Sequence, residues 1–171
     1  LTKHHLDMAY NLPLALFADP SVIITHHAQQ LADSLNIPLI SDPQGYQVFF
    51  SLTPDCLELI ALEEASKKPS SLRVDFTTIK NLHRIRNPHK ELLIRAIKIR
   101  RKIPAAVVDA TGGLGRDAFL LAAAGCKVDV FERNCLIGAL LADGLKRAAL
   151  TPQTAYVCDR IRLHIQNTVK H

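Results

Sequence analysis

One short segment constrains the fold more than any other: an apolar strand runs into a glycine-rich loop, which opens a helix. Residues 105–109 predict the strand, residues 111–115 the loop and residues 116–124 the helix. Gly113 and Gly115 let the backbone approach a ligand closely, since glycine has no Cβ. The helix that follows offers unpaired N–H groups and the positive end of its dipole. The segment therefore predicts half of a site for a nucleotide or nucleoside.

A carboxylate completes this half-site. Residues 127–131 predict a second strand, which ends at Glu132, 17 residues after Gly115. A carboxylate in that place can accept hydrogen bonds from both hydroxyls of a ribose. Residues 136–149 predict a further helix and residues 161–165 a third strand. Strands that alternate with helices predict a parallel, doubly wound sheet, so the expected fold class is α/β and Rossmann-like.

Two cofactor classes use such a loop. Gly113 to Ala118 matches the looser form of the dinucleotide pattern, GxGxxA, which leaves an NAD(P)-binding oxidoreductase open. Asp109, at the end of the first strand, would repel a pyrophosphate. S-adenosylmethionine (SAM) has no phosphate and carries a sulfonium and an ammonium group, which Asp109 and Asp117 suit. These acids therefore favour SAM over NAD(P). A third alternative is that the loop binds no ligand and only connects the strand to the helix.

A cluster of basic residues lies just before the first strand of this region. Residues 77–102 carry nine Lys and Arg against one acid, Glu91, in a chain of net charge +5. Helical spacing after Pro88 predicts one amphipathic helix with a basic stripe. The stripe is either a solvated face or a surface that contacts nucleic-acid phosphates. The candidate RNA-binding residues are Arg84, Arg86, Lys90, Arg95, Lys98, Arg101 and Lys102.

The remaining part of the chain predicts a small α/β subdomain. Residues 22–25, 46–52, 57–61 and 72–76 favour strands, residues 26–35 favour a helix, and residues 63–71 favour a loop. We therefore expect three parts: a subdomain at residues 1–76, a basic linker and helix at 77–103, and a Rossmann-like domain at 104–171. Four widely spaced cysteines without a CxxC pair predict no metal site and fit a reducing cytoplasm.

The string from Val108 to Phe119, VDATGGLGRDAF, resembles the ribosomal RNA small-subunit methyltransferase J family. Residues 125–126, 132–134, 140–145 and 159–163 also fit that family, as do residues 74–76 and 83–84. The resemblance covers roughly residues 46–171 and is much more specific than a bare glycine loop.

This resemblance implies a cytoplasmic enzyme that transfers a methyl group from SAM to the exocyclic N2 of a guanosine in 16S ribosomal RNA. The implied partner is that RNA or the small ribosomal subunit. It further implies cofactor contacts at the matching positions, where Glu132 would hold the ribose. These positions are Asp109, Gly113, Gly115, Arg116, Asp117, Glu132, Arg133, Asn167 and Thr168.

The chain departs from the family in two places. Residues 85–89 replace a stretch that is often glycine-rich in the family. The family also carries an Asp-Pro-x-[Phe/Tyr]-Pro motif after the next strand, and the sequence given ends at His171. We therefore expect the catalytic residues beyond His171, and we expect these 171 residues alone not to methylate RNA. A catalytically inert RNA-binding module is a further alternative.

Overall fold

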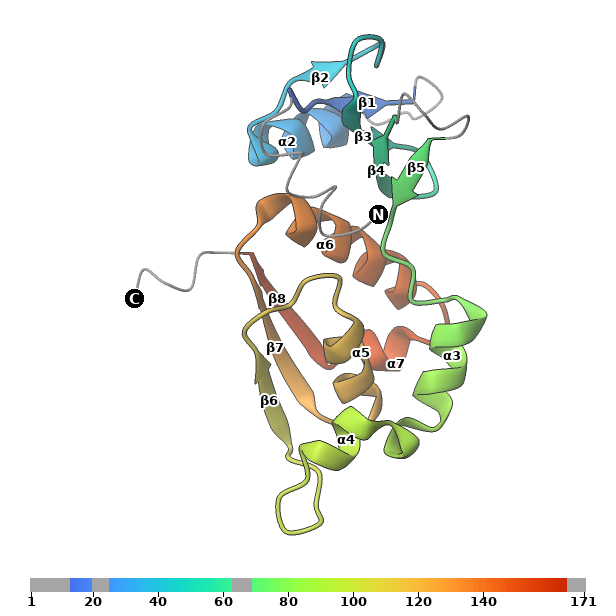
Figure 1. Cartoon of the computed structure of the whole chain (residues 1–171), viewed down its shortest axis with the longest axis vertical. Coiled ribbons are helices and arrows are strands. Elements are labelled where there is room, and N and C mark those ends of the chain that lie inside the picture. The colour runs from blue at the N-terminus through green and yellow to red at the C-terminus, as the bar shows by residue number, and fades with distance from the viewer. Residues whose placement is uncertain (1–12, 20–24, 63–68, 166–171) are drawn as a thin grey trace. The chain divides into compact units, whose positions relative to one another are not determined.

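The computed structural model describes residues 13–19, 25–62 and 69–165, and it divides the chain into two compact units, Leu1–Arg73 and Val74–His171 (Figure 1). The second unit contains both the basic segment and the whole described part of the expected cofactor half-site. None of the helices in the described ranges is long and apolar enough to cross a membrane.

The first unit is built on a five-stranded sheet with the order β2-β1-β3-β4-β5. Its elements are β1 (Leu16–Ala18), α2 (Thr25–Leu35), β2 (Leu39–Ile40), β3 (Val48–Leu52), β4 (Leu57–Ala61) and β5 (Ser70–Leu72). β1 is parallel to both of its neighbours, and β3, β4 and β5 pair antiparallel. The predicted helix and the strands β3 and β4 are confirmed, although β3 begins two residues later than expected.

Three predictions at the margins of this unit were wrong. Thr25 begins helix α2 instead of ending a strand, and the rest of that expected strand, residues 22–24, lies outside the described residues. Ser70 and Ser71 belong to β5 instead of a loop. The expected strand at residues 72–76 does not form, because β5 ends at Leu72.

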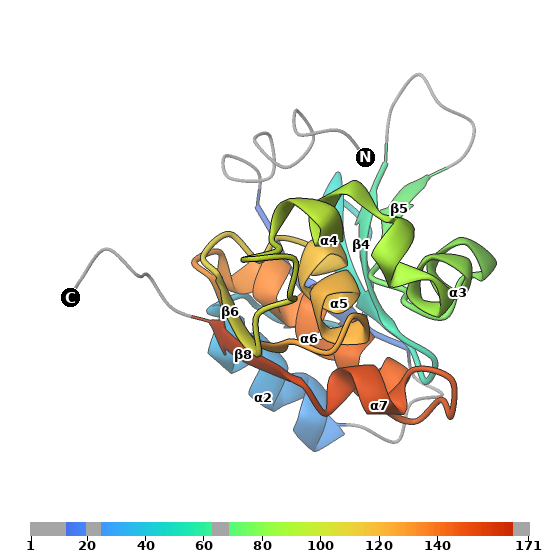
Figure 2. The same ribbon diagram turned by 90° about the horizontal axis from the view of Figure 1, so that it is seen from below.

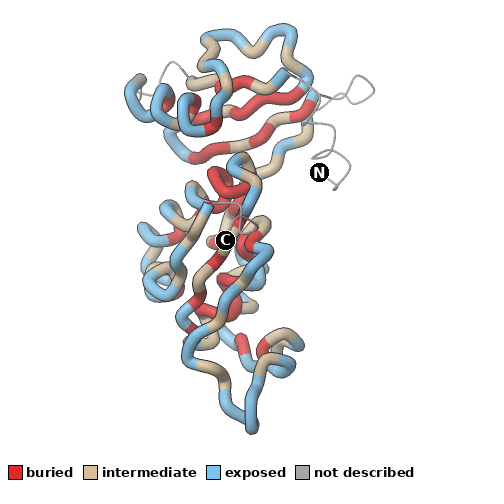
Figure 3. The backbone as a smooth tube through the Cα atoms, turned by 90° about the vertical axis from the view of Figure 1, so that its left-hand side faces the viewer, coloured by how far each residue is buried: buried red, intermediate tan, exposed pale blue. Residues whose placement is uncertain are grey.

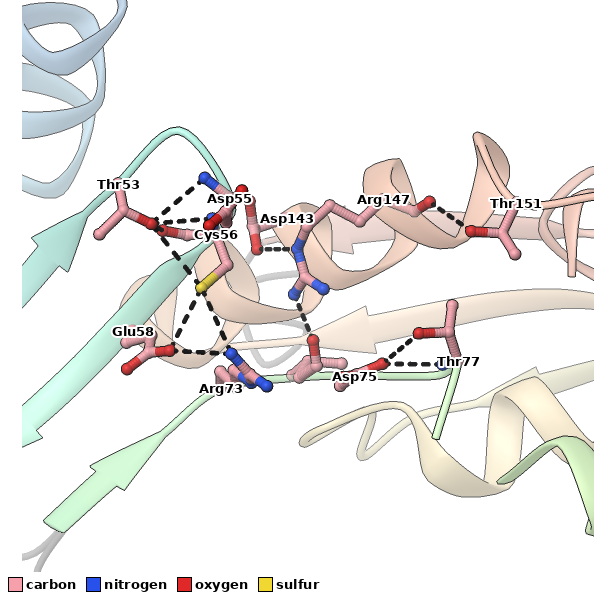
Figure 4. Close-up of polar contacts among 11 residues, drawn as sticks. Thr53, Asp55, Cys56, Glu58, Arg73, Asp75, Thr77, Asp143, Arg147 and Thr151 are labelled. Atoms are coloured by element: carbon pink, nitrogen blue, oxygen red, sulfur yellow. Dashed lines mark hydrogen bonds and ion pairs between the residues drawn. The ribbon is translucent and has the colours of Figure 1, made fainter. Parts of the chain in front are cut away.

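Long-range contacts explain why β5 ends there. In the first unit, Arg73 Nη1 donates a hydrogen bond to Glu58 Oε1 at 3.2 Å. In the second unit, the Val74 carbonyl accepts a hydrogen bond from Arg147, whose Nε also donates to Asp143 Oδ2 at 2.8 Å (Figure 4). The backbone carbonyl that a longer β5 would need for a sheet ladder is thus used by a helix of the second unit.

The second unit contains a parallel sheet with the order β6-β7-β8. Its strands are β6 (Ala106–Asp109), β7 (Lys127–Glu132) and β8 (Ile161–Ile165), and the connecting helices are α5 (Arg116–Ala123), α6 (Cys135–Ala149) and the short α7 (Ala155–Cys158). The predicted alternation of strands and helices is confirmed. Helix α7 was not predicted.

The helices of this unit gather on one face of the sheet (Figures 1 and 2). Along β7, Val128, Val130 and Glu132 are buried, and the residues between them are more exposed. Figure 3 shows the backbone of the described residues coloured by burial. On the face opposite to these buried residues, Phe131 stacks on His164 with ring centroids 4.5 Å apart. The period-2 pattern of the strand thus separates a helix-covered face from a more open one.

The single basic helix expected after Pro88 was wrong, because the chain there forms the 3-10 helix η1 (Pro88–Lys90) and the short helix α4 (Leu92–Ala96). Helix α3 (Ile79–Arg86), which precedes Pro88, was not predicted. Thr78 caps α3 by accepting a hydrogen bond from the Asn81 N–H at 3.3 Å. Pro88 has no N–H and disfavours helical backbone at the preceding residue, so Asn87 adopts φ −134° and α3 ends.

A tight turn follows α4 and leads toward β6. Ile99 and Lys102 exchange two backbone hydrogen bonds of 2.9 and 3.0 Å. The two residues between them, Arg100 and Arg101, have φ values of 50° and 68°. Two positive φ angles are typical of a type I′ turn, which normally takes Asn and Gly. For other residues this left-handed backbone costs about 1–2 kcal/mol per residue.

Candidate cofactor site

The glycine loop begins at the carboxyl end of β6. Asp109 Oδ1 accepts hydrogen bonds from the backbone N–H of Thr111 at 3.1 Å and from its hydroxyl at 3.5 Å. The Gly112 N–H then donates to the Phe131 carbonyl at 2.8 Å, which ties the loop to β7. The loop is therefore held by both strands, and Asp109 lies at the carboxyl end of β6.

Gly112 is a residue that the sequence analysis missed. A Cβ at this position would lie 2.5 Å from Val130 Cγ1 and 3.2 Å from the Phe131 carbonyl oxygen. Only glycine allows the loop to lie this close to β7. The sequence did carry a signal for it, the adjacent pair Gly112-Gly113, but only Gly113 is among the predicted cofactor residues.

Glu132 lies at the junction of the loop and β7. Its side chain is buried, and its two carboxylate oxygens accept different backbone hydrogen bonds. Oε2 accepts from the Gly113 N–H at 2.7 Å, and Oε1 accepts from the Asn134 N–H at 2.8 Å. Because a carboxylate offers about four acceptor positions, each oxygen keeps one for a ligand. The carboxylate is thus fixed in place while it can still accept from two hydroxyls.

Gly113 and Gly115 have the backbone conformations that the sequence required. Their φ values are 51° and 72°, and Gly115 caps the N-terminus of α5. A Cβ on Gly115 would lie 2.4 Å from Leu141 Cδ1 on α6. The Gly115 N–H donates to the Gly112 carbonyl at 2.8 Å. Since the Gly113 and Gly115 amides are both used within the protein, the loop lacks two donors that a pyrophosphate would use.

The other predicted cofactor residues lie around this loop. Arg116 and Asp117, in the first turn of α5, are exposed, as is Arg133 after β7. Asp109, Arg116 and Asp117 help to line a groove of about 600 Å³ along β6 and the loop. Asn167 and Thr168 lie outside the described residues. The structure thus brings Asp109, Gly113, Gly115, Asp117 and Glu132 together at one end of the sheet.

Three of the four cysteines, Cys56, Cys126 and Cys158, show no sign of nucleophilic activation. Burial raises the pKa of the Cys158 thiol to about 11, and burial also raises the pKa values of Cys56 and Cys126. Raised pKa values keep a thiol protonated and unreactive. In the described part of the chain, no three His, Cys, Asp or Glu side chains are grouped so that they could hold a metal ion.

Six of the seven predicted RNA-binding residues are exposed, and the exception is Arg84. Its guanidinium donates to Glu91 Oε2 at 2.9 and 3.2 Å. This hydrogen bond and the neighbouring negative charge raise the pKa of Arg84. Arg84 therefore joins α3 to the start of α4. The exposed six are Arg86, Lys90, Arg95, Lys98, Arg101 and Lys102.

The Arg84–Glu91 pair is expected to stabilise the second unit only above acid pH. The hydrogen bond from Arg84, with its charge, lowers the pKa of the Glu91 carboxyl below its ordinary value of 4.5. A carboxyl whose pKa is lower in the folded state than in the unfolded state stabilises the folded protein at pH values above its unfolded-state pKa. This stabilisation is lost as the pH falls through the folded-state pKa. Tm should therefore be higher for the wild type than for Glu91→Gln at neutral pH. A difference in Tm that persisted fully in strong acid would contradict this assignment.

Comparison with known proteins identifies the family. A family model described as "Putative SAM-dependent methyltransferase" matches residues 30–171. The chain belongs to this family. This match confirms the expected SAM-dependent methyltransferase class, and it covers the whole glycine loop together with Glu132.

Curated relatives of this methyltransferase chain carry the name ribosomal RNA small subunit methyltransferase J. The protein from Aeromonas salmonicida is 42% identical over 139 residues, which are 80% of this chain and 53% of the relative. That from Thioalkalivibrio sulfidiphilus is 39% identical over 82% of this chain and 55% of the relative. The Marinobacter nauticus protein is 34% identical over 98% of this chain and 59% of the relative. The chain thus spans somewhat more than half the length of these relatives.

A solved structure supports the fold of this methyltransferase chain. A SAM-dependent methyltransferase from Neisseria gonorrhoeae superposes with a TM-score of 0.69 at 27% sequence identity. The superposition covers 92% of this chain and 62% of that protein. Together with the parallel sheet of the second unit, it confirms the predicted α/β, Rossmann-like methyltransferase class.

Proposed function

We propose that this chain binds SAM at the loop between β6 and α5, and that Glu132 accepts hydrogen bonds from the two ribose hydroxyls. The observation that carries the proposal is the fixed carboxylate, which is buried and held by the amides of Gly113 and Asn134. A ligand that meets a preorganised acceptor does not bear the entropic cost of ordering it.

The charges around the loop support a cationic ligand. Asp109 and the exposed Asp117 provide negative charge beside the glycines, and opposite charges favour a sulfonium and an ammonium group. The Gly113 amide already donates to Glu132 and the Gly115 amide to the Gly112 carbonyl. An NAD(P) pyrophosphate would therefore meet carboxylates and occupied donors.

For the whole protein, we propose methyl transfer to the exocyclic N2 of a guanosine in 16S ribosomal RNA, in the cytoplasm. The names of the curated relatives and the exposed basic side chains between Arg86 and Lys102 support this substrate. SAM would supply the methyl group. The residues of this chain would hold the cofactor and contact RNA phosphates, so their contribution is positioning.

The proposed activity is tested in cells that lack the gene encoding this chain. Mass spectrometry of their 16S ribosomal RNA should show the loss of one N2-methylguanosine, and the intact gene should restore it. Unchanged methylation at every guanosine of 16S RNA would contradict the proposed substrate.

The 171 residues alone are expected to bind SAM without transferring its methyl group. We place the residues that grip the target base in the part of the relatives' length that this chain does not span. Incubation with radiolabelled SAM and 16S RNA should leave the RNA unlabelled. Measurable turnover would place the catalytic residues within this chain. An inert RNA-binding module would instead bind RNA and ignore SAM.

A further inference from the structure

We infer that the turn from Ile99 to Lys102 is an anchor for the RNA backbone, remote from the cofactor. This inference rests on the proposed function and extends it, since it names a contact site for the RNA substrate that the glycine loop does not provide. Three observations carry it: the charge of the turn, its strained backbone and its place in the fold.

The turn concentrates positive charge that nothing in the described structure neutralises. Lys98, Arg100, Arg101 and Lys102 are four cations among five consecutive residues, and all of them are exposed. Among the described residues, no hydrogen bond or ion pair engages these four side chains. Arg84, in contrast, is fixed by Glu91. Unpaired Lys and Arg side chains on an exposed turn are suited to contact phosphates.

The backbone of the turn is unfavourable for the residues that occupy it. Arg100 and Arg101 both have positive φ angles, and the turn between Ile99 and Lys102 is closed by two hydrogen bonds. A connection that served only to link α4 to β6 would be more stable with Asn and Gly at these positions. Two strained arginines at the tip of a turn point instead to a function of the guanidinium groups, because strain persists where it serves binding.

The position of the turn defines what it can contact. It precedes β6, whereas Asp109 ends that strand and the glycine loop follows it (Figure 1). β6 has four residues, so the strand alone separates the two ends by about 13 Å. A base that reacts near the cofactor does not reach the turn, but the phosphates of a longer RNA do. We therefore assign the turn to backbone contacts that hold the RNA without reading its sequence.

The test replaces the arginines with the residues that this turn type prefers, Arg100→Asn with Arg101→Gly, in the full chain. The variant should melt about 3 °C higher than the wild type, because the strain is relieved. Its affinity for a fluorescein-labelled RNA stem-loop should fall by about tenfold, and the slope of log K against log salt should shrink by about two. A merely connecting turn would give the gain in Tm with unchanged RNA affinity.

A matched control removes two other exposed cations, Lys146→Gln on α6 with Arg160→Gln before β8. This variant has the same change in net charge and should bind the stem-loop within about twofold of the wild type. Equal losses of affinity in both variants, or no loss in the turn variant, would overturn the inference. SAM binding is measured separately by calorimetry: failure of the proposed function would abolish SAM binding in the wild type, whereas failure of the anchor would leave it intact.

Discussion

Replacing Glu132 with alanine is expected to weaken SAM binding by about 100-fold. The carboxylate accepts from the Gly113 and Asn134 amides and keeps an acceptor position on each oxygen for the ribose. A hydrogen bond to a charged group contributes about 1.5–3 kcal/mol, and 1.4 kcal/mol corresponds to a tenfold change in affinity. Alanine removes the ribose acceptors and also frees the loop. Calorimetry with SAM measures the change in Kd.

Two further variants separate ligand contact from loop support. Glu132→Gln has nearly the same shape and keeps one side-chain oxygen, so we expect a smaller loss, about tenfold. Asp129→Asn is the control, because Asp129 also lies on β7 but away from the glycine loop. Its carboxylate contacts His164 Nε2 at 2.8 Å, and its backbone lies opposite Val108 of β6. This variant should bind SAM like the wild type. Unchanged affinity in Glu132→Gln and Glu132→Ala would remove Glu132 from the site.

Replacing Gly115 with alanine is expected to destabilise the second unit by about 3 kcal/mol. The residue has φ 72°, and an added Cβ would lie 2.4 Å from Leu141 Cδ1 and 3.2 Å from Phe76 Cζ. Both neighbours are buried, and Phe76 stacks on Phe119 with ring centroids 4.1 Å apart. Left-handed backbone costs about 1–2 kcal/mol and overpacking of a core about 1–3 kcal/mol. Urea unfolding measures the sum.

Gly125 provides the matched control for this substitution. It also has a positive φ, 106°, but nothing lies within 4 Å of a Cβ built there. Gly125→Ala should therefore carry backbone strain without overlap and should cost about 2 kcal/mol less than Gly115→Ala. Equal losses of stability would show that the close packing of Gly115 against α6 is not energetically important.

The second unit could largely be predicted from the sequence because its signals are local. The apolar strand before Asp109, the glycines and the strand that ends at Glu132 all lie between residues 105 and 132, and each step depends on near neighbours. The resemblance to a methyltransferase family then supported SAM as the cofactor. What local reasoning missed at the loop was Gly112, because its role depends on Val130, a residue of the next strand.

The helix after Pro88 was mispredicted because helical periodicity alone was used, and periodicity does not show where a helix ends. Residues 93–102 fit a helical pattern, but α4 ends at Ala96, and Arg100 and Arg101 form a turn with positive φ that propensity would not place there. The end of β5 could not be predicted for a different reason. It depends on Arg147, which lies 73 residues further along the chain from Val74.

Titration of the wild-type chain with SAM and, separately, with NADH tests most directly whether the loop between β6 and α5 builds a SAM site. The acids at 109 and 117, the occupied glycine amides and the fixed Glu132 carboxylate predict saturable 1:1 binding of SAM, lost in Glu132→Ala, and no heat with NADH. Binding of NADH with no response to SAM would contradict this prediction.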